Sequence, residues 1–477
     1  MLFFTSVPTY VHTLNLVAIV LVIFFQNKEP TTRFAWIVLL IFLPLAGFFL
    51  YMLFGHNYSR RERLRYSDGL LEELNNYFRE QVESTERMDF ADKRFVQLAR
   101  MNMVNDQARL HHNNKVEVFV HGEDKFTRLM QDISEAREYI HLLYFIFRTD
   151  ELGRAIIDLL TEKARLGVEV KVVFDDLGSV GVSRSAFREL RQAGGQVFHY
   201  SPLLNIFTTN YRNHTKIAVI DGRIGYIGGM NIGQEYIRGR KKLSPWRDTH
   251  LRVEGTAAGS METTFLLDYA YASGQVDHVD HLSRFFKPAE SFDGTGNTVM
   301  QLLTSSPRPG KYHIHNAYAK MIASAERYLY IHTPYLIPDR TLLDTLVNAA
   351  ASGVDVRIML PGIPDKAFVY YASLYYARKL FEQGVKIYFY NGFLHSKMLL
   401  ADGQVLSIGS ANMDIRSLYL SYEANVCIYD RKLAEEQRLQ YEKDIQNCRL
   451  VREGYFNSLP LPVRMLMPVS QLFSPLL

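Results

Sequence analysis

An internal repeat is the feature that most constrains the fold of this chain. The segment Leu166–Val172 (LGVEVKV) returns as Ser352–Ile358 (SGVDVRI), and shorter echoes precede and follow each copy. A repeat of this length indicates two copies of one domain and not a solenoid of short units. A chain of 477 residues also has room for two or three domains.

Short apolar runs alternate with segments of helical periodicity inside the repeat. In the first copy we expect strands over Tyr139–Phe147, Val168–Phe174 and Gln196–Tyr200, and helices over Arg154–Arg165 and Arg184–Ala193. This alternation predicts an α/β fold in which each copy has a mixed or parallel sheet flanked by helices.

Differences in composition along the chain indicate its domain boundaries. We expect a transmembrane hairpin at 1–58, a juxtamembrane helical connector at 59–110, a first lobe at 111–275, an inter-lobe linker at 276–300, a second lobe at 301–455 and an amphipathic tail at 456–477. The tail contains several Met, Leu and Phe residues. It is expected to lie either in the membrane interface or against the lobes.

The N-terminal region has two long apolar stretches. Leu2–Phe25 and Phe34–Phe54 contain no Lys, Arg, Asp or Glu, and each has about the 20 residues that a helix needs to cross a bilayer. They predict a two-helix transmembrane hairpin. Four arginines lie between residues 60 and 65, against two basic residues in the connecting loop. The positive-inside rule therefore predicts that the N-terminus and the large C-terminal part are cytoplasmic.

A polar motif occurs once in each copy of the repeat. In both copies Lys follows His by two residues, Asp follows Lys by five, and Asn follows Asp by ten. Residues two apart in a strand point to the same face, so each copy should present an imidazole and an ammonium group side by side. The two sets are His214, Lys216, Asp221 and Asn231, and His395, Lys397, Asp402 and Asn412.

These residue types suit phosphoryl transfer without a metal. One imidazole can attack phosphorus to form a phosphohistidine, and a second can protonate the leaving oxygen. The lysines and asparagines would hold the phosphate oxygens. Each copy supplies half of the set, so we expect the two lobes to face each other around one site. A single His-x-Lys would carry little weight, but two copies with identical offsets favour a shared site over coincidence.

The aspartates of the motif have two possible roles. Asp221 and Asp402 complete the repeated pattern and are counted with the catalytic set. Each stands in an Asp-Gly turn, however, where a structural role is favoured. The cysteines Cys427 and Cys448 have no metal-ligand spacing. We expect no metal and no cofactor.

The duplicated motif resembles the HxKxxxxD signature of the phospholipase D superfamily. The resemblance extends over nearly the whole chain to the bacterial cardiolipin synthases, through Thr333–Pro338, Asn412–Ser417, Phe473–Leu477 and the apolar hairpin. It implies two tandem phospholipase D-like lobes behind a transmembrane hairpin in the bacterial inner membrane. It also implies a phosphatidyltransferase that makes cardiolipin and glycerol from two phosphatidylglycerol molecules, with no cofactor.

The resemblance also implies residue roles. His214 would be the nucleophile and His395 the general acid and base, although the near-symmetric pattern permits the reverse. Asp248 would orient His214, and Glu423 would orient His395. Asn231, Asn412 and Ser410 would bind phosphate; the first copy has Gly229 in place of Ser410, so that hydroxyl would act on one side only.

Other functions remain open at this point. The same machinery could use water as acceptor, as a phospholipase D that releases phosphatidic acid, or serve another phosphatidyltransferase. The net charge of +4 argues against a broad nucleic-acid surface. We therefore expect phosphatidylglycerol, other anionic phospholipids and the bilayer as partners, and no nucleic acid.

The basic cluster at 238–242 is either a headgroup contact or a solvated loop. The motif fixes neither the acceptor nor the oligomeric state.

Overall fold

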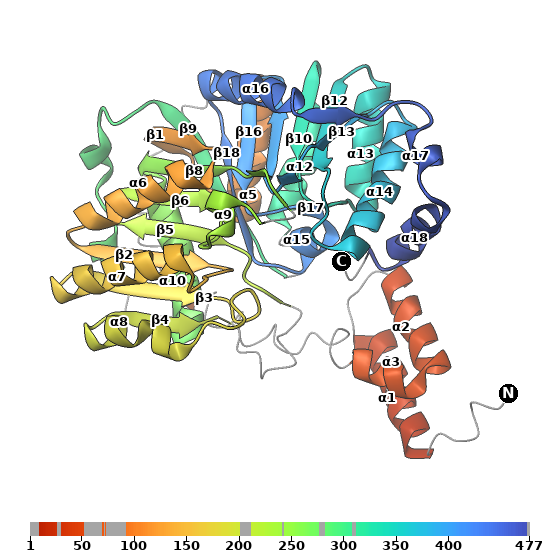
Figure 1. The fold of residues 1–477 in the computed structure, drawn as a ribbon, viewed down its shortest axis with the longest axis horizontal. Helices are drawn as coiled ribbons and strands as arrows, with labels where there is room; N and C mark the ends of the chain where they lie inside the picture. Colours follow the sequence, from red (N-terminus) through yellow and green to blue (C-terminus); the bar gives the residue numbers. More distant parts are fainter. Residues whose placement is uncertain are drawn as a thin grey trace.

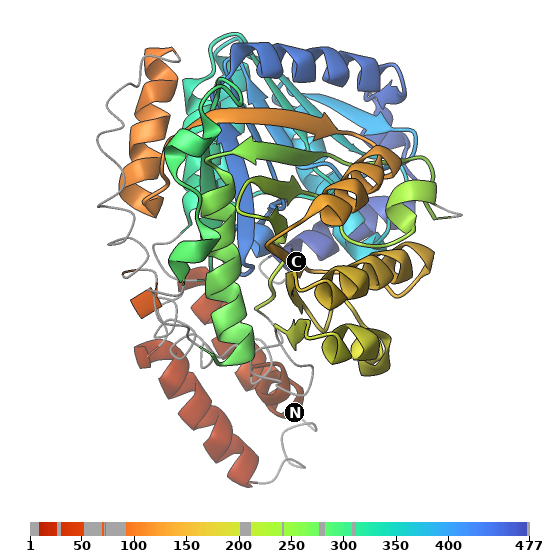
Figure 2. The same ribbon diagram turned by 90° about the vertical axis from the view of Figure 1, so that its left-hand side faces the viewer.

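Two lobes of similar architecture share one continuous sheet. The structure is a computed structural model, and it describes residues 9–25, 30–51, 69–70, 72, 92–200, 211–240, 243–275, 282–307 and 312–474. Within these ranges the main sheet has 15 strands, with helices packed on both faces (Figure 1, Figure 2). The N-terminal helices lie apart from the lobes, on the side where the C-terminus ends (Figure 1).

The first lobe forms one half of the sheet, in the order β1-β8-β6-β5-β2-β3-β4. Its strands are β1 (His111–Phe119), β2 (Tyr139–Tyr144), β3 (Glu169–Phe174), β4 (Gln196–His199), β5 (Lys216–Ile220), β6 (Ile224–Gly228) and β8 (His250–Gly255). Its main helices are α6 (Gly122–Glu135), α7 (Glu151–Arg165), α8 (Arg188–Gln192), α9 (Glu235–Arg238) and α10 (Ala258–Ser273). The elements expected from the repeat are found as β2, β3, β4, α7 and α8.

The second lobe repeats this order from the centre outward, as β9-β18-β16-β15-β10-β12-β13-β19. Its strands are β9 (Thr298–Ser305), β10 (Tyr328–His332), β12 (Asp355–Pro361), β13 (Lys386–Tyr390), β15 (Met398–Ala401), β16 (Val405–Gly409), β18 (Glu423–Ile428) and β19 (Cys448–Leu450). Its main helices are α12 (His313–Ser324), α13 (Arg340–Ala351), α14 (Ala367–Phe381), α15 (Ile415–Tyr419) and α16 (Arg431–Ile445). Antiparallel pairing of β1 with β9 joins the halves.

Two elements lie outside the boundaries expected from composition. Strand β9 begins at Thr298, inside the range expected for the linker, so the second lobe starts earlier than predicted. Helix α5 (Lys93–Asp106) was expected to belong to a juxtamembrane connector. Its Phe95 and Leu98 are instead buried in the apolar core of the second lobe. The rest of the expected connector lies almost entirely outside the described residues.

The N-terminal region forms three helices, α1 (Thr9–Phe25), α2 (Pro30–Phe42) and α3 (Pro44–Leu50). They pack around a small apolar cluster in which Trp36 meets Tyr51 edge to face. The second expected span is interrupted at Leu43, because Pro44 cannot continue the hydrogen-bond pattern of α2. Among the described residues, no helix is both long and apolar enough to cross a membrane. The predicted transmembrane hairpin is therefore not confirmed.

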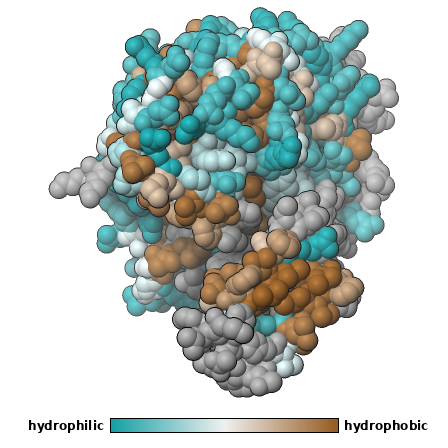
Figure 3. Space-filling model, turned by 90° about the vertical axis from the view of Figure 1, so that its right-hand side faces the viewer, coloured by the Kyte–Doolittle hydropathy of each residue, from teal (hydrophilic) through white to brown (hydrophobic). Residues whose placement is uncertain are grey.

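The C-terminal tail packs on the second lobe. Helices α17 (Tyr455–Ser458) and α18 (Leu461–Leu472) follow β19. The Tyr376 hydroxyl donates to Ser474 Oγ at 3.2 Å, and the Phe368 and Phe473 rings meet at 5.4 Å. The tail therefore lies against α14, one of the two placements that the sequence left open, while it also leaves large apolar side chains exposed. Figure 3 views this side of the molecule, where apolar side chains gather mainly over the N-terminal helices.

Candidate active site

The two His-x-Lys motifs occupy matching positions in the sheet. Lys216 is the first residue of β5, and Lys397 directly precedes β15. Both lysine side chains are buried, and each Nζ donates to the backbone carbonyl of the histidine two residues earlier. Each lobe therefore holds its His–Lys pair at the N-terminal end of an equivalent strand.

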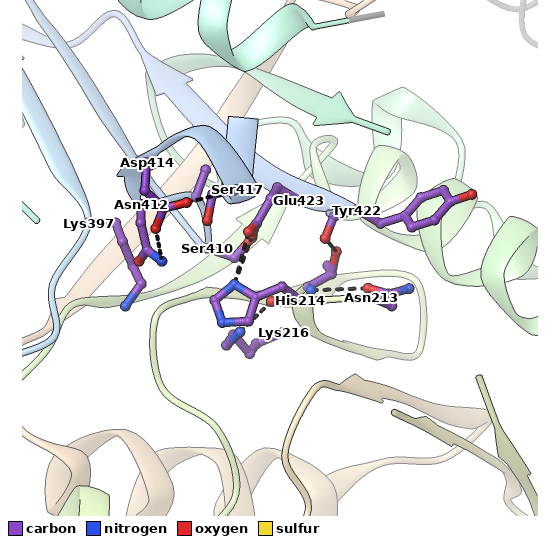
Figure 4. A network of polar contacts seen from close by, with 12 residues as sticks. Asn213, His214, Lys216, Lys397, Ser410, Asn412, Asp414, Ser417, Tyr422 and Glu423 are labelled. Atoms are coloured by element: carbon purple, nitrogen blue, oxygen red, sulfur yellow. Dashed lines mark hydrogen bonds and ion pairs between the residues drawn. The ribbon is translucent and has the colours of Figure 1, made fainter. Parts of the chain in front are cut away.

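A short backbone ladder ties the first motif to the second lobe. The His214 amide donates to the Tyr422 carbonyl at 2.9 Å, and the Tyr422 amide donates to the Arg212 carbonyl at 2.9 Å. The residue after Tyr422 is Glu423, at the start of β18. The ladder therefore brings its carboxylate to His214, whose Nδ1 lies 3.0 Å from Oε1 and 3.1 Å from Oε2 (Figure 4).

A matching ladder ties the second motif to the first lobe. Strand β14 (Phe393–Leu394) pairs in parallel with β7 (Trp246–Arg247), and the His395 amide donates to the Arg247 carbonyl at 2.7 Å. The next residue, Asp248, places its Oδ2 2.6 Å from His395 Nδ1. The arrangement of the first motif is thus repeated with the lobes exchanged.

The predicted pairing of histidines with carboxylates is wrong. The sequence pattern assigned Asp248 to His214 and Glu423 to His395, which keeps each pair within one lobe. In the structure each imidazole contacts the carboxylate of the other lobe. The physical reason is that both carboxylates directly follow the backbone ladders that join the lobes. The two halves therefore complete each other, as the division of the motif suggested.

Ser410 supports Glu423 instead of presenting a free hydroxyl. Its Oγ donates to Glu423 Oε2 and accepts from the Ala424 amide at 3.0 Å. Phosphate binding by Ser410 stays a prediction, and it would require the hydroxyl proton to leave Glu423. The equivalent Gly229 has no room for a side chain, since an added Cβ would lie 2.0 Å from Asp248 Oδ1. The two histidine–carboxylate pairs thus have different surroundings.

The two predicted phosphate-binding asparagines are both buried at the site. Asn231 Oδ1 accepts from the Ile146 amide at 3.0 Å, and its Nδ2 donates to the Tyr236 hydroxyl at 2.6 Å. Asn412 Nδ2 donates to Asp414 Oδ2 at 3.0 Å (Figure 4). Each amide nitrogen makes one of these bonds and carries a second hydrogen, so phosphate binding by both asparagines stays a prediction.

The motif aspartates lie at the far ends of β5 and β15 from the histidines. Asp221 accepts hydrogen bonds from the backbone amides of residues 137, 138 and 139, at 2.8 to 2.9 Å. Asp402 accepts from the amides of residues 326, 327 and 328, at 2.8 to 3.0 Å, and from the Arg94 guanidinium. These contacts favour the structural role over the catalytic one for Asp221 and Asp402, and the catalytic role stays a prediction. They fix the chain entering β2 and β10.

Comparison with known families agrees with this geometry. The family described as "Cardiolipin synthase, PLD-like domain" matches residues 129–242 and 318–445, so that each match contains one His-x-Lys motif. A second family, "Phospholipase_D-nuclease N-terminal", matches residues 13–56. The chain is 40% identical to the major cardiolipin synthase ClsA of Bacillus subtilis, and the match covers 97% of both chains. The chain belongs to the cardiolipin synthase family.

Other similar proteins support the same grouping. The cardiolipin synthase of Listeria monocytogenes is 39% identical, again over 97% of both chains. Among solved structures, the phosphatidylserine synthase of Haemophilus influenzae matches with a TM-score of 0.63 and 16% identity, covering 80% of this chain and 100% of that one. That likeness concerns the fold alone. As a member of the cardiolipin synthase family, the chain is an enzyme, a phosphatidyltransferase.

Aromatic rings that the sequence analysis missed line this cardiolipin synthase site. Phe145 lies 4.9 Å from the His214 ring, and Tyr236, Trp246 and Phe393 surround His395 at 5.7 to 6.0 Å. Their signal in the sequence was weak, because they come from four separate segments. Among the described residues, no group of three or more His, Cys, Asp or Glu side chains could hold a metal ion.

Burial keeps both imidazoles neutral in the free enzyme. It lowers the pKa of His214 well below the usual value, and the nearby Lys216 and Lys397 lower it further. Burial and Lys397 lower the pKa of His395 to about 4, while Asp248 opposes the shift. A neutral imidazole whose Nδ1–H donates to a carboxylate carries its lone pair on Nε2. That nitrogen is therefore the one available to attack phosphorus.

Burial also changes the charged groups beside the histidines. It lowers the pKa of Lys216 to about 7 and that of Lys397 to about 8, and it raises the pKa of Glu423 to about 7. An anion placed between the lysines would favour their protonated forms and be held by them in return. The site therefore suits a phosphodiester group.

Replacing Asp402 by Ala tests the structural role of the motif aspartates. We expect the free energy of unfolding to fall by about 2–4 kcal/mol, because several buried donors lose their acceptor. Denaturant unfolding in detergent measures this, with Asp221→Ala as the matched variant. Below its unfolding temperature, the folded variant should keep its turnover number within about threefold. A loss of turnover at unchanged stability would instead make Asp402 catalytic.

The lysine pKa values predict a pH dependence of lipid affinity. Each lysine is cationic below its pKa, so raising the pH from 7 to 9 should raise the KM for phosphatidylglycerol, by up to about tenfold per pH unit for each lysine. Initial rates over this range measure the effect. Lys216→Arg is the control, because a guanidinium keeps its charge and should flatten part of the profile. A KM that does not change with pH would contradict the assignment of these lysines to phosphate binding.

Proposed function

We propose that this enzyme transfers a phosphatidyl group from one phosphatidylglycerol to another and releases cardiolipin and glycerol. The observation that carries the proposal is the pair of imidazoles, one from each lobe, each hydrogen-bonded to a carboxylate of the other lobe and flanked by a buried lysine. This set contains a nucleophile, an acid and a cradle for a phosphate anion. The names of its relatives point to the same product.

The first half-reaction forms a covalent intermediate. The bound phosphate anion favours the imidazolium form of His395, which takes up a proton from solvent when the lipid binds. His214 Nε2 then attacks phosphorus, the N–P bond forms and the P–O bond to glycerol breaks, while the His395 imidazolium gives its Nε2 proton to the departing oxygen. Lys216 and Lys397 bind the phosphate oxygens and stabilise their charge as it develops. Asp248 stabilises the imidazolium form of His395, as the carboxylate does in other histidine-based sites.

The second half-reaction returns the enzyme to its starting state. His395 removes the proton of a headgroup hydroxyl on a second phosphatidylglycerol, whose oxygen attacks the phosphatidyl-histidine. The new P–O bond forms, the N–P bond breaks and cardiolipin leaves. His214 is assigned as the nucleophile because its partner Glu423, with its pKa raised to about 7, gives less support to a cationic imidazole than Asp248 gives to His395.

The direct test is lipid turnover by purified enzyme in detergent, given phosphatidylglycerol alone. We expect cardiolipin and glycerol in equal amounts, and a loss of at least about 10³-fold in His214→Ala and in His395→Ala. Mass spectrometry of the products makes the measurement, with and without chelator. Phosphatidic acid as the only lipid product would make the enzyme a hydrolase, and an active His214→Ala variant would exclude His214 as the nucleophile.

We also propose that the N-terminal helices anchor the enzyme in the bacterial cytoplasmic membrane as a hairpin, with the lobes in the cytoplasm. Large apolar side chains on all three helices are exposed, among them Leu16, Phe34 and Phe49. Such side chains gain stability in lipid and lose it in water. The arginines at 60–65 favour the cytoplasmic side for the lobes.

Extraction and labelling test the anchor. The enzyme should remain in the membrane pellet at alkaline pH, which removes peripheral proteins. In a background lacking Cys427 and Cys448, Lys28→Cys should react with a membrane-impermeant maleimide from outside the cytoplasmic membrane. An exposed cysteine in the second lobe, Lys379→Cys, should react only after the membrane is opened. Release at alkaline pH, or the opposite labelling pattern, would overturn the proposed anchor.

A further inference from the structure

Cardiolipin synthesis places two phosphates near one site. The donor phosphate fits between the buried Lys216 and Lys397, but the acceptor lipid brings a second phosphate, separated from its reacting hydroxyl only by the headgroup glycerol. That second phosphate therefore needs a cation near the mouth of the site. The inference below rests on the proposed function and concerns where this second phosphate binds.

Lys366 is an exposed cation of the second lobe. It directly precedes α14, and among the described residues it makes no ion pair. Its Nζ lies 5.1 Å from the centre of the Tyr335 ring, which supports an ammonium by a cation–π contact. The Tyr335 hydroxyl donates to Asp365 Oδ2 at 2.6 Å, so the ring is held in place.

Backbone contacts connect this group to the phosphate pocket. Tyr335 precedes β11 (Leu336–Ile337), which pairs in parallel with β17 (Met413–Asp414). The Met413 amide donates to Thr333 Oγ1 at 3.0 Å, and the residue before Met413 is Asn412, whose side chain lies at the pocket. The charge of Lys366 also contributes to lowering the pKa of His214. Lys366 is therefore near enough to the reacting centre to affect its electrostatics.

An apolar surface continues from Lys366 toward the tail. Phe368 is 39% exposed and packs on Phe473, and beyond it Val469 and Leu472 of α18 are 46% and 74% exposed. Among the residues of α18 none is acidic. A cation beside an apolar surface matches the two parts of an anionic phospholipid, its phosphate and its acyl chains.

We propose that Lys366 and Tyr335 form the headgroup subsite for the acceptor phospholipid, with its phosphate on Lys366 and its acyl chains over Phe368 and the exposed face of α18. The first lobe does not repeat this feature. The turn after β3 begins with Asp175 and Asp176, where the turn after β12 leads to Lys366. That turn of the first lobe contains no lysine, so the subsite is present in one lobe only and distinguishes acceptor from donor.

Competition between two acceptors tests the subsite. Enzyme in detergent is given phosphatidylglycerol together with ethanol, so that one phosphatidyl-enzyme divides between cardiolipin and phosphatidylethanol. Both products share the donor step, and their ratio therefore reports acceptor binding alone. In Lys366→Met the ratio of cardiolipin to phosphatidylethanol should fall by about tenfold, the effect of losing one charge-assisted contact. Lys366→Arg should keep the ratio within about threefold of the original enzyme.

Lys379→Met is the matched control, because it removes an exposed lysine of α14, the helix that Lys366 precedes, and its ratio should not change. If the ratio is unchanged in Lys366→Met, even when both products fall together, the subsite is overturned. It is also overturned if the ratio falls as much in Lys379→Met as in Lys366→Met. A failure of the proposed function looks different. In that case the original enzyme itself would make phosphatidylethanol or phosphatidic acid but no cardiolipin.

Discussion

The hydrogen bonds between each imidazole and the carboxylate of the other lobe are the interactions on which the site depends. They set the tautomer of His214 and of His395, and they exist only while the lobes are held together. The continuous sheet and the two short backbone ladders supply that constraint. Either lobe alone would have an imidazole without an orienting carboxylate and half of a phosphate cradle. The single site therefore needs both copies of the duplicated domain.

The two lobes are nearly symmetric, but the surroundings of their histidine–carboxylate pairs differ, which suits different roles in the proposed mechanism. Ser410 supports Glu423, whereas Asp248 occupies the space that a side chain on Gly229 would need. The carboxylates also differ in length, and burial raises the pKa of Glu423, which supports different roles for the two histidines in the proposed mechanism. Outside the pocket, Lys366 has no counterpart after β3. A transferase with two lipid substrates requires such asymmetry, because the donor and the acceptor must bind in different ways.

Local features of the fold could be predicted from the sequence, and contacts between distant segments could not. The repeat, the strands β2 to β4 and the Asp-Gly turns after β5 and β15 follow from nearby residues, and Asp221 and Asp402 do have positive φ angles of 51° and 54°. The pairing of Asp248 and Glu423 was predicted wrongly, because their neighbours come from the other lobe. For the same reason the burial of α5 in the second lobe was missed. The transmembrane prediction rested on composition alone, and the break at Pro44 divides its second span.

Nitrogen NMR of histidine-labelled enzyme in detergent tests the exchange of carboxylates between lobes most directly. The resonances of the two imidazoles can be assigned with His214→Gln and His395→Gln. We predict that Glu423→Gln weakens the Nδ1–H signature of His214 and lowers its pKa while His395 stays unchanged, and that Asp248→Asn does the reverse. If Asp248→Asn instead perturbs His214, or if each substitution affects only the imidazole of its own lobe, the two halves do not complete each other and the account is wrong.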